Sequence, residues 1–266
     1  MDMIAAIDMD ILMIIGVVLL GLLFGSFITM ASYRIPRGEE IIIRRSHCPH
    51  CNHNLYFTDL IPVFSWLAHK GACAYCKQPI SSRYPIIEIV SGAAFITVYM
   101  IYGMTMATVL LWLVAICLMV MIIVDFEHYI IPDRVQLVLL PLVIALRLIA
   151  GGNILNILLG GIGGLAVGMG LRVMIRLWKK QEGLGLGDVK FLGIAGCALD
   201  PVLITLFLFL AGVIGIITAL CWRLLGKGIL FPFGPALAVS LFACLLIPHP
   251  QMIGQDLSRL AMILAR

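Results

Sequence analysis

The sequence predicts an all-α polytopic membrane protein, with about eight transmembrane helices and a small zinc-binding cytoplasmic insertion between the first two. Apolar residues make up 62% of the 266 residues and charged residues only 12%, and the mean hydropathy is +1.10. Soluble domains contain roughly 45–50% apolar and about 25% charged residues. A soluble chain of this length could not bury so much apolar surface. The composition therefore excludes a water-soluble enzyme, a disordered tail and a nucleic-acid binder.

The first predicted span is Ile11–Tyr33, which contains no charged residue. About 20 apolar residues suffice to cross the hydrocarbon core of a bilayer, so this segment is long enough alone. A cleavable signal peptide would begin with basic residues, whereas Met1–Asp10 contains three aspartates. We therefore expect a retained first span.

Seven further apolar segments follow the insertion. In chain order they are two spans within Ile89–Val124 that turn near Tyr102-Gly103, then Pro132–Ala150, Ile154–Leu171, Leu184–Leu199, Leu203–Trp222 and Ile229–Pro248. The Leu184–Leu199 segment is short and rich in glycine. Together with the first span they predict eight crossings.

The lysine and arginine residues predict the orientation, because cytoplasmic loops retain positive charge. With Met1 outside, only Arg147, Arg259 and Arg266 of the 18 basic residues lie on the outer side. Both termini are therefore expected to be non-cytoplasmic. The expected organisation is a first span at 1–33, a cytoplasmic zinc-binding domain at 34–84, a seven-span domain at 85–250 and a non-cytoplasmic tail at 251–266.

Two C-x2-C pairs, Cys48/Cys51 and Cys73/Cys76, are separated by 21 residues within the insertion. Four thiolates at this spacing are typical of a tetrahedral zinc site. The cytoplasm keeps thiols reduced and free to bind metal. An insertion of about 50 residues has too little core to fold alone, and a metal crosslink compensates for this deficit. A site closed by four thiolates is structural; the alternative, a pair of disulfides, would require the opposite topology.

Acidic residues occur at two predicted span boundaries. Asp125, Glu127 and Asp133 follow the third span, and Asp188 opens the sixth span within a glycine-rich stretch. The predicted topology places Asp125 and Asp188 at the same cytoplasmic depth. Two carboxyl groups around one water molecule can share a proton. Such a pair can activate the water for attack on a peptide carbonyl and protonate the leaving amine.

Simpler roles also fit these acids. Asp133 follows a proline and could cap a helix, and Glu127 could be a solvated loop residue. The pair itself could form static ion pairs with Lys190 or Arg134, or bind a transported cation. On these residues alone, an aspartic protease and an ion-coupled membrane carrier are equally supported.

Several short motifs then occur in one order along the chain. They are Gly25-Ser26-Phe27, Tyr33-Arg34-Ile35-Pro36, the two cysteine pairs flanking Ile61-Pro62-Val63-Phe64-Ser65-Trp66 and Gly71, Ser82-Arg83-Tyr84-Pro85 with Glu88, Asp125 to Asp133, Gly185-Leu186-Gly187-Asp188-Val189-Lys190, and Phe233-Gly234-Pro235. With this set, the chain resembles the type IV prepilin peptidases, the bifunctional leader peptidases and N-methyltransferases of pilus and type II secretion systems.

The resemblance implies a multi-pass aspartic endopeptidase of the bacterial inner membrane, with Asp125 and Asp188 as catalytic acids. Its substrates would be membrane-embedded prepilins or pseudopilins, cut at a Gly-Phe-type bond on the cytoplasmic face to remove a short basic leader. It would then methylate the new N-terminus with S-adenosylmethionine. The zinc ligands of the family map onto the four cysteines of the two pairs.

The methyl-transfer site is less clear from the residues. The chain lacks the glycine-rich strand-to-helix fingerprint of a nucleotide-binding fold. We expect the site in the insertion, in the region of Glu39, Glu40, Gly71, Tyr84 and Glu88. Glu88 is the candidate for a cofactor-binding residue, and an ion pair with the nearby arginine at position 83 is the alternative.

Overall fold

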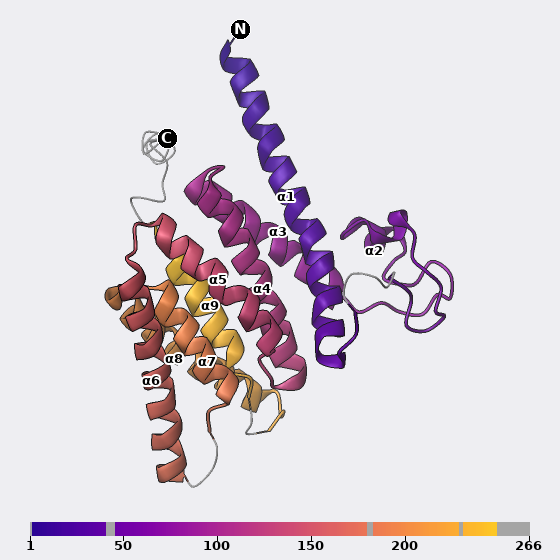
Figure 1. The fold of residues 1–266 in the computed structure, drawn as a ribbon. Helices are drawn as coiled ribbons and strands as arrows, with labels where there is room; N and C mark the ends of the chain where they lie inside the picture. The colour runs from indigo at the N-terminus through magenta and orange to yellow at the C-terminus, as the bar shows by residue number, and fades with distance from the viewer. Residues whose placement is uncertain (1, 41–45, 180–182, 229–230, 249–266) are drawn as a thin grey trace. The chain divides into compact units, whose positions relative to one another are not determined.

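The computed structural model describes residues 2–40, 46–179, 183–228 and 231–248 (Figure 1). Within these ranges the regular elements are helices, together with two isolated β-bridges in the insertion. The chain divides into two compact units, Met1–Met100 and Ile101–Arg266, called unit 1 and unit 2 below. The expected tail at 251–266 lies outside the described residues.

Unit 1 consists of two long helices and the insertion between them. Its elements are α1 (Asp2–Arg34), the 3-10 turns η1 (Ile35–Arg37) and η2 (Phe57–Leu60), the short α2 (Phe64–Ala68), and α3 (Arg83–Tyr102), which ends just beyond the unit. The two long helices approach closely because α1 has a glycine at the contact. A Cβ at Gly25 would lie 2.5 Å from the Cα of Glu88. The rings of Phe24 and Phe95 stack nearby, with centroids 5.6 Å apart.

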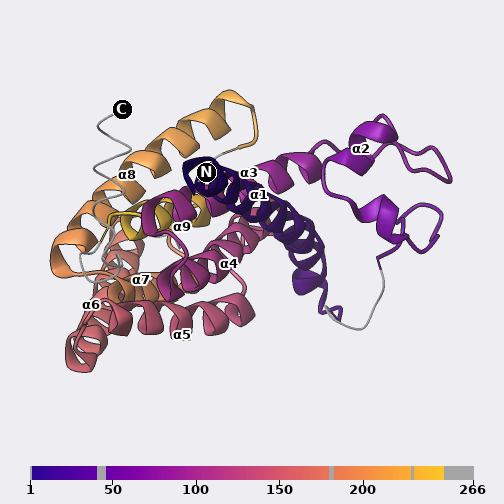
Figure 2. The same ribbon diagram turned by 90° about the horizontal axis from the view of Figure 1, so that it is seen from above.

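Unit 2 is a bundle of six helices within the described residues. They are α4 (Met106–His128), α5 (Asp133–Ile149), α6 (Ile154–Lys179), α7 (Leu186–Ala198), α8 (Pro201–Leu224) and α9 (Gly234–Leu245). α4 packs against α5 and α9, and α7 packs against α5, α6 and α9 (Figure 2). The side chains of Val114, Met121 and Val124 are fully buried, so α4 forms the core of this unit.

Each of the eight predicted spans overlaps one helix, although the bounds differ by up to nine residues. Five are long and apolar enough to cross a membrane within the described part of the chain: Asp10–Arg37, Arg83–Tyr102, Met106–His128, Ile154–Trp178 and Pro201–Leu224. The prediction of an all-helical membrane chain is confirmed. α7 and α9 have 13 and 12 residues. At about 1.5 Å per residue such helices are shorter than a hydrocarbon core of about 30 Å, so the count of eight crossings stays a prediction.

Small residues fix the position of α7. Gly160, Gly164 and Gly168 lie on one face of α6, opposite Leu192 and Gly196 of α7. A Cβ at Gly168 would lie 3.0 Å from the Leu192 side chain, and one at Gly160 or Gly164 would overlap a backbone carbonyl oxygen of α7. This is the small-residue packing that lets membrane helices approach closely. The first turn of α7, which contains the second predicted acid, is thereby held in place.

Candidate functional site

Asp125 lies one turn before the end of α4 and its side chain is buried, with 5% of its surface exposed. The helix ends at His128 because Tyr129 adopts a left-handed conformation, and the Tyr129 amide donates to the Asp125 carbonyl at 2.9 Å. The carboxylate accepts a hydrogen bond from the backbone N–H of Gly234 at 2.8 Å. Gly234 begins α9, so a helix N-terminus holds this acid.

Asp188 lies in the first turn of α7, where its carboxylate accepts a hydrogen bond from the Gly185 amide at 3.1 Å. Two contacts place this turn beside the segment that follows α4. The Gln136 side-chain amide donates to the Gly187 carbonyl at 3.3 Å. A Cβ at Gly187 would lie 3.1 Å from the Cβ of Ile131. The glycine at this position therefore allows the close approach.

The structure brings these two acids together from separate helices. The charge of Asp125 acts on the Asp188 carboxyl group, so the two lie within range of direct electrostatic interaction. α9, which supplies the hydrogen bond to Asp125, also packs against α7. Two carboxyl groups that interact in this way can share one proton.

The other two acids of the cluster have different surroundings. Glu127 is exposed. Asp133 forms an ion pair with Lys190 at 2.7 Å, with 63% and 52% of the two side chains exposed. Asp133 is the first residue of α5 rather than its N-cap, and a negative charge there is favourable near the helix N-terminus. Lys190 thus pairs with Asp133, whereas one alternative from the sequence paired it with Asp125 or Asp188.

The four insertion cysteines form one cluster. Their sulfur atoms all lie within 4.8 Å of one another, and Cys48 Sγ and Cys76 Sγ are 3.8 Å apart. Zinc–sulfur bonds of about 2.3 Å in a tetrahedron place the sulfurs about 3.8 Å apart, so the donor set fits zinc. Backbone N–H groups of Cys76 and Tyr75 lower the pKa of Cys73 to about 7, which favours the thiolate. The four are free thiols rather than disulfides.

The two cysteine pairs have the same local backbone structure. The Asn52 amide donates to the Cys48 carbonyl at 2.9 Å, and the Lys77 amide donates to the Cys73 carbonyl at 3.1 Å. Asn52 and Lys77 each follow the second cysteine of their pair, with φ of 55° and 60°. The positive φ turns the chain back after each pair. Two equivalent turns thus present two sulfurs each to a shared centre.

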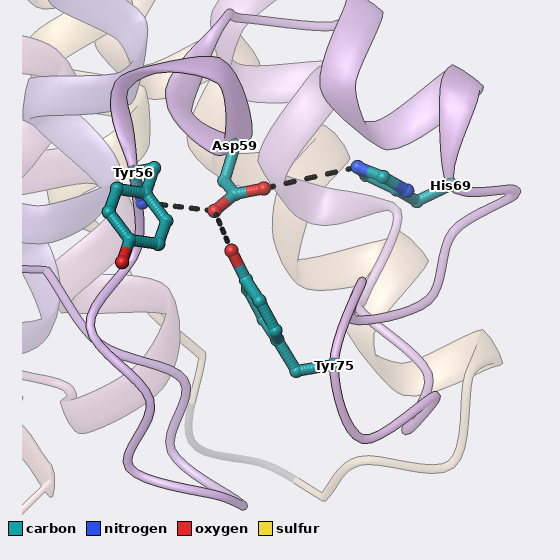
Figure 3. A network of polar contacts seen from close by, with 4 residues as sticks. All are labelled: Tyr56, Asp59, His69 and Tyr75. Carbon is teal, nitrogen blue, oxygen red and sulfur yellow. Dashed lines mark hydrogen bonds and ion pairs between the residues drawn. The ribbon is translucent and has the colours of Figure 1, made fainter.

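A network of polar contacts around Asp59 joins the second cysteine turn to the segment that follows the first (Figure 3). The carboxylate accepts hydrogen bonds from the Tyr56 amide at 2.9 Å and the Tyr75 hydroxyl at 3.1 Å, and lies 4.0 Å from His69 Nε2. Burial and the Asp59 carboxylate raise the pKa of Tyr75, which keeps the hydroxyl protonated as a donor. The Tyr75 ring also contacts His53, with centroids 3.7 Å apart. Sequence reasoning missed Asp59; its spacing three residues after Tyr56, at the start of a 3-10 turn, was the available signal.

Glu88 lies near the start of α3 and is 7% exposed. Its carboxylate accepts a hydrogen bond from the Val63 amide at 2.7 Å. It lines a cavity of about 430 Å³ in unit 1, together with residues of α1 and the insertion. The candidate for a cofactor-binding residue therefore borders a cavity, but also has a partner within the protein.

Comparisons with known proteins identify the family. Residues 19–102 match the Bacterial Peptidase A24 N-terminal domain, and residues 112–220 match the Type IV leader peptidase family. The prepilin leader peptidase/N-methyltransferase of Dichelobacter nodosus is 31% identical, over 84% of this chain and 87% of the relative. The proteins of the same name from Bacillus subtilis (strain 168) and Stutzerimonas stutzeri are 31% and 28% identical, over 83% and 85% of this chain and 88% of each relative. No solved structure matches the chain.

The chain is therefore an enzyme of a membrane peptidase class. It belongs to the type IV leader peptidase family, and the resemblance found in the sequence is confirmed.

Proposed function

We propose that this enzyme removes the short basic leader of type IV prepilins or pseudopilins and then methylates the new N-terminus. The observation that supports the peptidase part most directly is the meeting of Asp125 and Asp188 from separate helices. The names of the relatives, each a prepilin leader peptidase and N-methyltransferase, support both parts.

In the proposed peptidase reaction the two carboxyl groups share one proton and hold a water molecule. The ionised acid takes a proton from the water as it attacks the peptide carbonyl, and the protonated acid polarises that carbonyl. The roles then exchange, and a proton passes to the leaving amine. The backbone amides of Gly234 and Gly185 donate hydrogen bonds to the two carboxylates. Because these donors are backbone groups, they do not depend on the side chain of another residue.

The proposed setting is the bacterial inner membrane, with eight spans, both termini non-cytoplasmic and the scissile Gly-Phe-type bond at the cytoplasmic face. The distribution of basic residues supports this orientation. Two ion pairs fit it as well. Arg147 and Asp200 pair where α5 ends and α8 begins, and Lys190 and Asp133 pair where α7 and α5 begin. The first pair would lie at the outer ends of these helices and the second at the cytoplasmic ends.

Methyl transfer is assigned to unit 1. Cys48, Cys51, Cys73 and Cys76 would hold a structural zinc ion that keeps the insertion folded. S-adenosylmethionine would supply the methyl group, with Glu88 among the residues that bind it. Four thiolates would fill the tetrahedral coordination of zinc, so this metal would have no direct role in chemistry.

The decisive experiment incubates the full-length protein in lipid vesicles with a membrane-embedded prepilin and S-adenosylmethionine. The mass of the product N-terminus is then measured. We expect loss of the leader and gain of one methyl group. An intact prepilin, together with coupled flux of a solute across the vesicle membrane, would contradict the proposal and favour the ion-coupled carrier.

A further inference from the structure

We propose that the cavity of unit 1 is the binding site for S-adenosylmethionine, a ligand that combines a purine, a sulfonium cation and an amino-acid carboxylate. The inference rests on the proposed methyl-transfer function and assigns it a location. The cavity lies between the second half of α1, the start of α3 and the insertion. Its volume of about 430 Å³ falls within the range of about 300–1,000 Å³ found for small-molecule sites.

Aromatic rings suited to a purine lie on the cavity wall. Trp66 and Tyr84 both line it. The indole N–H of Trp66 donates to the Ile80 carbonyl at 3.1 Å, which fixes the ring. The far edge of this ring packs against Gly71, where a Cβ would lie 2.9 Å from the Trp66 Cζ2 atom. A fixed indole is a preorganised surface for stacking of a nucleobase.

The charged groups on the wall complement both ends of the proposed ligand. Glu88, Glu39 and Asp59 line the cavity and supply negative charge for a sulfonium and an ammonium group. Arg34 also lines it, with only 4% of its surface exposed. One of its N–H groups donates to the Glu40 carbonyl at 3.2 Å. A buried guanidinium that shares one cavity with three carboxylates suits a zwitterionic ligand better than a simple anion or cation.

Glu88 contributes a negative charge to the cavity and also holds the backbone turn at Val63. The Val63 backbone has φ 61° and ψ −50°, and the Phe64 amide donates to the Pro62 carbonyl at 2.6 Å. These values define a tight three-residue turn that is rare and strained, especially for a β-branched residue. Such strain persists only where the surroundings enforce it and is common at ligand sites. The Glu88 carboxylate provides that restraint through its hydrogen bond to the Val63 amide.

The strained turn leads directly into α2, which contains Trp66. The hydrogen bond from Val63 to Glu88 therefore ties the stacking ring to α3. It also brings together sequence motifs that lie far apart. Ser26, Arg34, Trp66, Tyr84 and Glu88 come from four of the stretches that form the family resemblance, and all five line this one cavity. None of these stretches contains Asp125 or Asp188. What the four stretches share is a residue on the wall of this cavity.

The test measures binding of tritium-labelled S-adenosylmethionine to the full-length protein in lipid nanodiscs by equilibrium dialysis. Trp66→Ala removes the stacking surface, and we expect about tenfold weaker binding or more. Glu88→Gln removes the charge but keeps an acceptor for the Val63 amide, and we again expect about tenfold weaker binding. The matched control is Trp178→Ala, because Trp178 is 81% exposed on α6; its binding should equal that of the wild type.

A second measurement does not depend on folding of the variants. Ultraviolet crosslinking of the labelled donor to the wild-type protein, followed by peptide mapping, should place the label in peptides from 26–88. Label in unit 2, or unchanged binding in both cavity variants, would overturn the cavity assignment while leaving methyl transfer intact. A wild-type protein that removes the leader but neither binds the donor nor methylates a cleaved pilin would overturn the methyl-transfer proposal itself.

Discussion

The two units position their functional groups by different means. In unit 2, helix packing does the work: Asp125 and Asp188 are held by backbone amides at the starts of α9 and α7. In unit 1, short polar contacts position the groups: the cysteine cluster, the Asp59 network and the hydrogen bond between Glu88 and Val63. The difference teaches that a helical bundle can hold two carboxyl groups through its backbone, whereas a small insertion needs explicit crosslinks. Changes in one unit should therefore leave the chemistry of the other largely intact.

The largest effect is expected from removing either acid of the pair. Asp125→Asn and Asp188→Asn keep the size of the side chain and a hydrogen-bond acceptor but remove the ionisable group. Because the substituted residue can then no longer exchange a proton with the water or the leaving amine, leader removal should fall by about 10²–10⁴-fold or more. Gel mobility of a prepilin substrate measures the cleavage rate.

The same variants sharpen the comparison between the units. Binding of S-adenosylmethionine and zinc content should stay at the wild-type level, because both sites are proposed for unit 1. Cleavage by either variant at the wild-type rate would exclude that acid from the catalytic pair.

Removing the proposed zinc ion should impair methylation and spare leader removal. Chelation, or Cys73→Ser, removes the metal crosslink from an insertion that has little core of its own. We expect faster proteolysis within 46–82 and loss of most methylation, with leader removal within about twofold, since cooperative units can open independently. Limited proteolysis and the mass of the product N-terminus measure the two effects.

Cys221→Ser is the matched control for this experiment, because Cys221 is an exposed thiol on α8, outside the cluster. Unchanged protease sensitivity and methylation after complete chelation would show that the metal has no structural role.

Gly234→Ala should reduce cleavage by a smaller factor. A Cβ at Gly234 would lie 2.8 Å from the Asp125 carboxylate oxygen that its own amide binds. Overpacking of this kind costs about 1–3 kcal/mol, which corresponds to about 5–150-fold in rate if the acid is displaced. Gly212→Ala is the control, since a Cβ there meets nothing within 4 Å. Equal cleavage rates for the two variants would show that the α9 N-terminus does not position Asp125.

The helices, the cysteine cluster and the two acids of unit 2 were predictable from the sequence. Apolar runs with few charges predicted the helices, the cysteine spacing predicted the cluster, and acids at span boundaries predicted the pair. The links that hold these groups were not predictable, because they join residues far apart in the chain. The Glu88–Val63 bond spans 25 residues and the Gly234–Asp125 bond spans 109. A backbone amide leaves no signal in residue type, and a tertiary contact at this separation has no local pattern.

The smallest effect is expected at the exposed edge of the peptidase pair, where Asp133 pairs with Lys190. Exposed ion pairs contribute about 0.2–1 kcal/mol, so Asp133→Asn should slow leader removal by no more than about fivefold. The Asp133 carboxylate lies at the start of α5, and its partner Lys190 lies in the first turns of α7. Both side chains are exposed, so water can replace this ion pair when Asp133 is substituted. Asp188→Asn, two residues from Lys190, is measured alongside this variant. The comparison distinguishes the loss of a charge near the proposed site from the loss of a charge within it. A loss as large as that of Asp188→Asn would place Asp133 among the catalytic acids and would change the assignment of the pair.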